Sequence, residues 1–103
     1  MAFIMIYVTY GSVDEADKIT SHLLEKKLVS CANLFPITSS YWWKGKIEDS
    51  DEVVSILKTR SENLEKVKEA IKKMHSYDVP CIVKMNVGAN EEFEEWVERE
   101  SSD

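Results

Sequence analysis

Residues 39–47 read SSYWWKGKI and place Trp42 and Trp43 side by side just ahead of a turn-like segment. If this stretch is a strand, the two tryptophans point to opposite faces of the sheet, because strand side chains alternate. Helices can bury one of these faces. The stretch therefore raises the question of what covers the other face.

The length and composition suit one compact domain. The chain has 103 residues, of which 44% are hydrophobic, so residues 1–103 are expected to form a single domain with a modest core. No run of 18 or more apolar residues occurs, which predicts no membrane span. The N-terminal MAFIMIYVTY lacks a basic segment and a small-residue cleavage site, so it is interpreted as a strand and not as a signal peptide.

Charge and cysteine content argue against several function classes. The net charge is -6, and seven of the acidic residues lie within residues 91–103, so no basic face for nucleic acid is indicated. The only cysteines, Cys31 and Cys81, lie fifty residues apart, which predicts neither a disulfide scaffold nor a structural zinc site. We expect a cytoplasmic protein with free thiols.

Hydrophobic periodicity predicts alternating strands and helices. Residues 3–10 are apolar on both faces, as a central strand requires. Ser12 and Glu15 form a capping box that starts a helix over residues 13–28. The remaining predicted elements are a short strand over 30–35 broken at Pro36, a strand over 37–47, a turn at 48–51, a strand over 52–59, a helix from Ser61 to Met74, a strand over 79–87 that begins around Pro80, and a helix capped by Asn90.

This element order, β-α-β-β-α-β plus a C-terminal helix, predicts an α+β fold. The expected architecture is the ferredoxin-like split-βαβ sandwich, in which four antiparallel strands carry two helices on one face. Residues 37–59 would form a long hairpin with a bulge or bend near Pro36, because proline donates nothing to a ladder.

Large apolar groups are predicted on both faces of this sheet, as the pairs Val53–Val54 and Ile56–Leu57 show. An uncovered face of that width would exceed the apolar patch that a soluble monomer normally exposes. We therefore expect another copy of the chain to cover it. This closed homo-oligomer is preferred to a role of the tryptophans in stacking on a ligand.

Four motifs follow one another along nearly the whole chain: residues 31–33 (CAN), 41–47 (YWWKGKI), 56–59 (ILKT) and 75–80 (HSYDVP). In these motifs and their spacing the chain resembles the CutA1 family, the divalent-cation tolerance proteins. The resemblance implies a ferredoxin-like fold and a tight homotrimer in which each long hairpin extends the sheet of a neighbour. It implies that Tyr41, Trp42 and Trp43 lie at the trimer interface. It also implies a non-catalytic role in divalent-cation tolerance and the response to metal ions.

The chain departs from the family pattern at a few positions. Ser76 stands where a proline is usual in H-P-Y-D-V-P, so the connector lacks a stiffening residue. Relatives said to bind copper carry a thiol and a second histidine where this chain has Val8 and Met74. The resemblance therefore implies weaker copper binding here.

Imidazole and thiolate are the only borderline or soft metal donors of any strength in the chain. His75 and Cys31 are accordingly the candidate ligands for a divalent transition ion such as Cu²⁺ or Zn²⁺, although no cofactor is required. Each residue also has a simpler interpretation without a metal. His75 suits a helix C-terminus, and a buried cysteine such as Cys31 is common in protein cores.

A cleft between subunits is the second candidate site, with Lys58, Tyr77 and Asp78 as possible lining residues. The acidic residues within 48–52 lack the order of a calcium loop and suit a polar hairpin turn. Catalysis is not indicated, because G-x-S-x-G, P-loop and H-E-x-x-H motifs are missing. Two functions stay open: a metal-responsive homotrimer, and a trimeric sensor that binds a small anionic metabolite between subunits. The sequence does not identify a protein partner.

Overall fold

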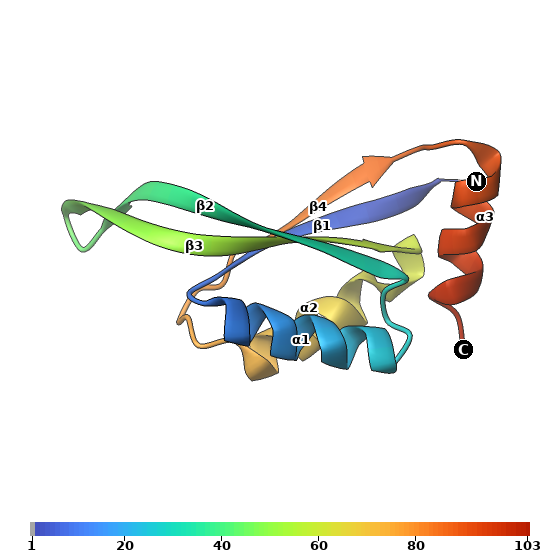
Figure 1. The fold of residues 1–103 in the computed structure, drawn as a ribbon, viewed down its shortest axis with the longest axis horizontal. Helices are drawn as coiled ribbons and strands as arrows, with labels where there is room; N and C mark the ends of the chain where they lie inside the picture. Colours follow the sequence, from blue (N-terminus) through green and yellow to red (C-terminus); the bar gives the residue numbers. More distant parts are fainter. Residues whose placement is uncertain (1) are drawn as a thin grey trace.

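The computed structural model describes residues 2–103 and has the predicted order of strands and helices (Figure 1). The elements are β1 (Phe3–Tyr10), α1 (Val13–Glu25), β2 (Cys31–Trp43), β3 (Lys46–Thr59), the 3₁₀ turn η1 (Ser61–Asn63), α2 (Leu64–Met74), β4 (Ile82–Val87) and α3 (Glu91–Glu100). The chain is therefore a mixed α+β protein.

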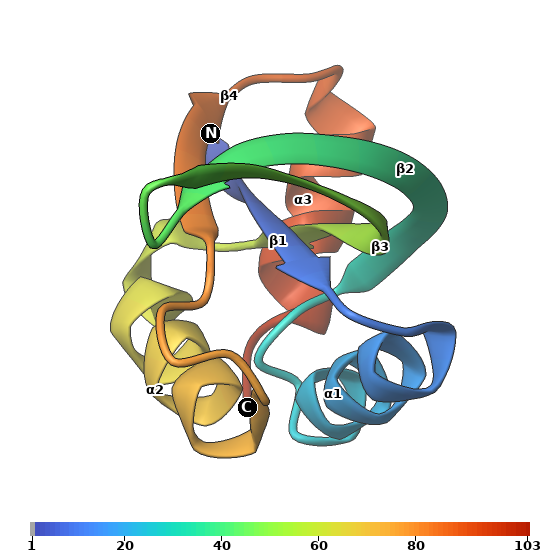
Figure 2. The ribbon, with the colours of Figure 1, turned by 90° about the vertical axis from the view of Figure 1, so that its left-hand side faces the viewer.

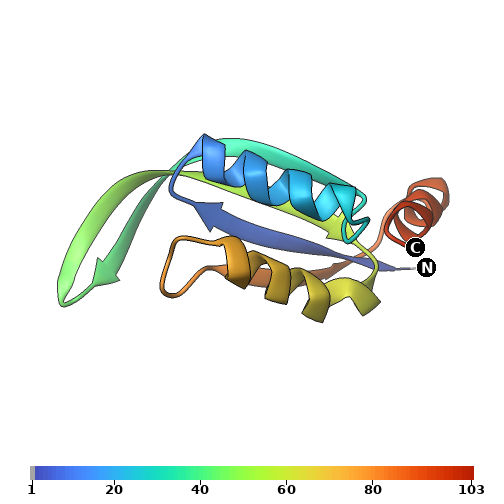
Figure 3. The ribbon, with the colours of Figure 1, turned by 90° about the horizontal axis from the view of Figure 1, so that it is seen from below.

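All four strands form one antiparallel sheet with the order β2-β3-β1-β4. The first strand of the chain is thus central, as its two apolar faces predicted. Helices α1 and α2 lie side by side across one face of the sheet (Figure 3), whereas α3 stands at one end of it (Figure 1).

The core lies between the sheet and these two helices. Alternate residues of β1 point into it, and the largest buried members are Ile4, Ile6, Tyr10, Ile19, Leu23, Leu57 and Ile71. The Tyr10 hydroxyl shares a 2.8 Å hydrogen bond with Ser55 Oγ, and burial raises the pKa of Tyr10 to about 12. This buried tyrosine is therefore neutral at physiological pH, and its one polar atom is satisfied.

Helix α1 starts at the predicted cap but ends earlier than predicted. Ser12 Oγ accepts a hydrogen bond from the Glu15 backbone N–H at 3.2 Å. The predicted end at residue 28 was wrong, because Lys27 adopts a left-handed φ of 56° and the Leu28 N–H bonds to the Leu23 carbonyl at 2.9 Å. These bonds form a Schellman closure, in which an apolar residue after the helix still packs against its last turn. Leu28 therefore continued the helical periodicity without being helical.

The hairpin turn lies four residues earlier than predicted. It consists of Lys44 and Gly45, whose φ angles are 51° and 79°, and Trp43 pairs directly with Lys46. A two-residue turn with positive φ at both positions is the type I′ turn that matches the twist of paired strands. The acidic residues within 48–51, predicted to form the turn, instead lie in β3.

Pro36 does not interrupt the second strand, contrary to the prediction of a bulge and two separate strands. It pairs with Val53 in a continuous register that runs from Cys31 to Trp43. Because β2 is an edge strand, the missing N–H of proline leaves no interior ladder position empty. At the opposite edge, β4 begins at Ile82 and not at residue 79, so Pro80 precedes the strand.

The other two helix starts also differ in detail from the prediction. Ser61 does not cap α2, because the 3₁₀ turn η1 comes first and Asn63 stands at the cap position. Asn90 holds the predicted N-cap position of α3, with extended backbone, but its side chain makes no capping hydrogen bond.

The β2–β3 hairpin reaches beyond both helices and gives the molecule a long axis of 45 Å (Figure 1). Viewed from the hairpin end, β2 and β3 arch over β1 on the side away from α1 and α2 (Figure 2). Trp42 pairs with Ile47 near the tip, and their side chains are 72% and 63% exposed. On the face away from α1 and α2, the exposed apolar side chains are Phe35, Tyr41, Trp43 and Val83. Helix α3 covers part of this open face, where Phe93 contacts Phe3 at 5.8 Å between ring centroids.

Candidate functional site

His75 ends α2 and is held by hydrogen bonds at both ring nitrogens. Its Nδ1 accepts the Tyr77 backbone N–H at 3.1 Å, which leaves Nε2 to donate to the Thr9 carbonyl at 2.7 Å. The ring also stacks on Tyr10 at 5.4 Å and meets Tyr77 edge-on at 4.7 Å. These contacts fix the orientation of the ring and give His75 a structural position.

A metal ion at His75 would have to displace one of these hydrogen bonds, because metal binding needs a free ring lone pair. Cys31 lies elsewhere in the subunit. It pairs with Lys58 on the open face, whereas His75 packs with Tyr10 on the helix-covered side. One chain therefore does not bring the two predicted ligands together, and in the part of the chain that the structure describes no three His, Cys, Asp or Glu side chains converge on a common point.

Glu15 ties the connector after α2 to the start of α1. Its Oε2 accepts the Ser76 backbone N–H at 2.8 Å, and its Oε1 accepts the Gly11 N–H at 3.4 Å. Burial alone would raise the pKa of Glu15, but the hydrogen bonds from Ser76 and Gly11 and the nearby His75 lower it below its ordinary value. A proline at position 76 could not donate this bond. The serine therefore gives the connector a tether that compensates for the missing ring.

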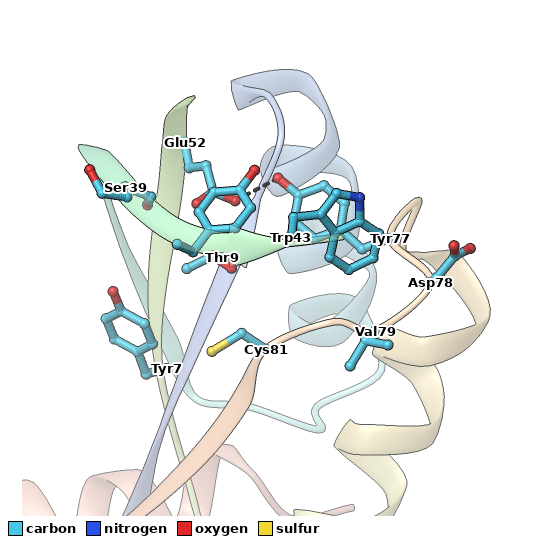
Figure 4. Close-up of a pocket in the computed structure, with 11 residues that line it drawn as sticks. Tyr7, Thr9, Ser39, Trp43, Glu52, Tyr77, Asp78, Val79 and Cys81 are labelled. Carbon is cyan, nitrogen blue, oxygen red and sulfur yellow. Dashed lines mark hydrogen bonds between the residues drawn. The ribbon is translucent and has the colours of Figure 1, made fainter. Parts of the chain in front are cut away.

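A pocket of about 500 Å³ opens on the side of the sheet away from α1 and α2 (Figure 4). The hairpin contributes Tyr41, Trp43 and Glu52, β1 contributes Tyr7, and the connector contributes Tyr77. The Tyr77 hydroxyl donates a 2.6 Å hydrogen bond to Glu52 Oε2, and the Glu52 side chain is almost buried. Burial, together with this bond and the charge of Glu52, raises the pKa of Tyr77 well above its usual range.

Two of the three predicted cleft residues line this pocket. Tyr77 forms part of its wall, and Asp78 stands on its rim. Lys58 lies elsewhere, because its Nζ donates to Asn33 Oδ1 at 2.9 Å and sits 5.5 Å from the centroid of the Phe93 ring.

Sequence reasoning missed the role of Glu52 and of Cys81, which both line the pocket. Burial, followed by the charge of Glu52, raises the pKa of the Cys81 thiol, so this cysteine is held in its unreactive form. The sequence did contain a signal that Glu52 differs from the other acidic residues of the hairpin. Glu52 directly precedes the apolar run Val53–Val54, whereas the other acids lie nearer the tip.

The fold and these motifs identify the family. The family model described as "CutA1 divalent ion tolerance protein" matches residues 4–100. The chain belongs to the CutA1 family. The CutA1 relative from Archaeoglobus fulgidus, a divalent-cation tolerance protein, is 47% identical over 94 residues, which cover 90% of this chain and 92% of the relative. The relative from Pyrococcus horikoshii is 42% identical over 99 residues, which cover 95% and 97% of the two chains.

Solved structures of CutA1 proteins agree with the fold. The periplasmic divalent cation tolerance protein CutA from Archaeoglobus fulgidus superposes with a TM-score of 0.94 at 44% identity, covering 99% of this chain and 100% of that one. The PII-like protein CutA from Nostoc superposes with a TM-score of 0.90 at 27% identity, covering 99% and 98%. No helix within residues 2–103 is long and apolar enough to cross a membrane. The cytoplasmic location stays a prediction, because the Archaeoglobus fulgidus relative is named as periplasmic.

Proposed function

We propose that this chain is the non-catalytic, ferredoxin-like subunit of a homotrimer that acts in divalent-cation tolerance. The observation that carries the proposal is the open face of the sheet, with its hairpin extending beyond the helices. Trp42 and Ile47 project from that hairpin largely exposed, and Phe35, Tyr41 and Trp43 lie uncovered on the open face. Exposed apolar patches of this kind mark interaction surfaces, and the CutA1 family name supplies the biological role.

The metal in this proposal is a divalent transition ion, bound with an affinity on the order of micromolar. His75 remains the proposed principal ligand, with Cys31 as a second ligand that a neighbouring subunit would have to supply. The hydrogen bonds of His75 set a condition on this site. Metal binding must release the Tyr77 N–H from Nδ1 or the Thr9 carbonyl from Nε2.

Calorimetry with Cu²⁺ and Zn²⁺ tests the metal site. Native protein is expected to bind one of the ions, and His75→Ala is expected to weaken binding by about tenfold or more. His22→Ala is the matched control, because it removes the only other histidine of the chain. Equal affinity in the native and His75→Ala proteins would remove His75 from the site, and an unaltered affinity in Cys31→Ser would remove the thiol.

A second candidate function is that of a trimeric sensor for a small molecule. Two observations favour it: the pocket of about 500 Å³ and the close superposition on the PII-like protein CutA from Nostoc. A thermal-shift screen that compares metal ions with small organic molecules separates the two functions, because a ligand of the native state raises the melting temperature. Stabilisation by metal ions alone would support the first function, and stabilisation by organic molecules alone would support the second.

A further inference from the structure

The hairpin tip carries an uncovered apolar pair on the side of the sheet that the helices face. Ala32 and Leu34 of β2 pack against the core, and Trp42 lies an even number of residues further along the same uninterrupted strand. Because strand side chains alternate, Trp42 and its cross-strand partner Ile47 point to the helix side. The tip lies beyond both helices (Figure 1), so these two side chains remain 72% and 63% exposed. Burial of the open face, on the opposite side of the strands, would leave this pair uncovered.

Two carboxylates continue this side of the hairpin. Asp49 and Asp51 follow Ile47 at alternate positions of β3 and are exposed. The basic residues of β2 and β3 (residues 31–43 and 46–59) are Lys46 and Lys58, and both occupy the other set of alternate positions. Trp42, Ile47, Asp49 and Asp51 therefore form an apolar surface with a negative border, which we call the tip patch.

A groove of about 490 Å³ between α2 and β4 has the complementary chemistry. It is lined by Lys68 and Lys72 of α2, by Val79 and Pro80 of the connector, and by Ile82 of β4. Ile82 packs against the core beneath the helices, so this α2 groove belongs to the helical layer and not to the open face. Val79 is 76% exposed, which gives the groove an apolar wall without a partner in its own chain.

The balance of charge in the α2 groove is positive. Within residues 2–103, Lys72 forms no ion pair, and Lys68 has only the surface pair with Glu65 at 3.5 Å. Among the described residues that line the groove, Asp78 is the one acid. Two ammonium groups thus stand beside an exposed apolar wall, as the two carboxylates of the tip patch stand beside Trp42.

We propose that the tip patch of one subunit docks into the α2 groove of the next subunit. The apolar side chains of the patch pack against the connector and β4, and its two carboxylates face the two lysines of α2. Two different surfaces of the same chain meet in this contact, and such a heterologous contact forms a closed ring when its rotation closes. The inference deepens the proposed homotrimer and rests on it. A small anion would match the groove but leave the tip patch uncovered, whereas a second copy of the chain satisfies both surfaces.

Charge reversal on each side tests the docking. Reversal of the groove (Lys68→Glu with Lys72→Glu) and reversal of the tip (Asp49→Lys with Asp51→Lys) each place like charges against each other. Each is expected to raise the chain concentration of half-dissociation by about tenfold or more. A chain with all four changes is expected to return to within about threefold of the native value. Light scattering on a dilution series measures this concentration, with denaturant added equally to all samples where the native assembly does not dissociate in buffer.

Lys66→Glu with Lys73→Glu is the matched control. Both lysines are exposed on α2 and lie outside the groove, and the exchange changes the net charge equally. It is expected to leave the concentration of half-dissociation unchanged. Circular dichroism checks that each variant is folded. Where a reversal prevents folding, the neutral exchanges Lys72→Gln and Asp51→Asn decide instead, each with an expected rise of about threefold.

An unchanged concentration after reversal or neutral exchange of either side would overturn the docking. An equal rise in the control, or no recovery in the chain with all four changes, would do the same. The failure of the docking and that of the assembly are distinguishable. A homotrimer that none of the exchanges weakens overturns only the docking, whereas a native chain that is monomeric at every concentration overturns the homotrimer itself.

Discussion

At the scale of single residues, the contacts of His75 and Glu15 show how the connector after α2 is fixed. The imidazole is held at both nitrogens, and the Glu15 carboxylate accepts the backbone N–H of the next residue, Ser76. The two side chains therefore place Tyr77 against Gly11. The contact is close, because a Cβ added to Gly11 would lie 3.4 Å from the Tyr77 hydroxyl oxygen. From this position the Tyr77 hydroxyl donates to Glu52 Oε2.

Glu15→Gln is expected to lower the free energy of unfolding at pH 7 by about 1 kcal/mol, because one of its two accepted bonds is lost. The folded pKa of Glu15 is depressed, so its contribution is present above the unfolded value near 4.5 and disappears as the pH falls through the folded pKa. The difference between the native and variant proteins should therefore shrink below about pH 4. Denaturant unfolding at pH 7 and pH 3 measures it.

Glu25→Gln is the control for this prediction, because Glu25 is an exposed acid on the same helix. It should lose no stability at either pH. An undiminished effect of Glu15→Gln at pH 3 would show that the carboxylate charge does not hold the connector.

At the scale of elements, the turn of the hairpin depends on backbone conformation more than on contacts. Gly45 has a φ of 79°, and a Cβ built there would meet no atom within 4 Å. Gly45→Ala is therefore expected to destabilise the protein by about 1 kcal/mol through left-handed strain alone. Lys44→Asn should act in the opposite direction, because asparagine tolerates the left-handed region better. Thermal unfolding of both variants measures the pair, and changes of the same sign would contradict this account.

Asn63 joins three elements near the other end of the sheet. Its Nδ2 donates to the Leu28 carbonyl after α1, to Thr59 Oγ1 in β3 and to the Ser101 carbonyl after α3, at 3.1, 3.0 and 2.7 Å. The side chain is buried. We expect Asn63→Ala to destabilise the protein by about 1–3 kcal/mol, because the Ser101 carbonyl loses its donor, whereas the Leu28 carbonyl keeps the bond from the Thr59 hydroxyl.

Chemical denaturation with Asn86→Ala as the control measures this effect. Asn86 is an exposed residue of β4 whose side chain makes no hydrogen bond with another residue in the part of the chain that the structure describes. A loss no larger than that of the control would show that the three carbonyl and hydroxyl acceptors find other partners.

These elements also show what the sequence could predict. The central position of β1 followed from its two apolar faces, and the start of α1 followed from Ser12. The hairpin turn was misplaced because a run of acids and a Lys-Gly pair are both polar, and only the φ angles distinguish them. Asn63 and Glu52 could not be predicted, since their partners lie up to 38 and 25 residues away in the chain.

At the scale of the whole molecule, the open face and the projecting hairpin are the surfaces on which the proposed homotrimer rests. Light scattering is expected to give about three times the 11.9 kDa of one chain. Trp42→Ala should weaken the assembly by about 2 kcal/mol or more, as truncation of a central interface tryptophan does. Leu24→Ala is the control, because Leu24 is an exposed apolar residue of α1 in the helical layer. A folded native monomer would contradict the assembly.

The central place of β1 has a consequence for synthesis. This strand leaves the ribosome before its partners β3 and β4, and its last pairing joins Phe3 to Val87. Both edges of this apolar strand are unpaired until β3 emerges, and one edge stays unpaired until β4 emerges, which leaves the nascent chain prone to aggregation. A chain that ends before β4 is expected to precipitate at concentrations at which the full chain stays clear, as turbidity would show. The order of synthesis therefore makes a central strand of the finished sheet the most vulnerable strand of the growing chain.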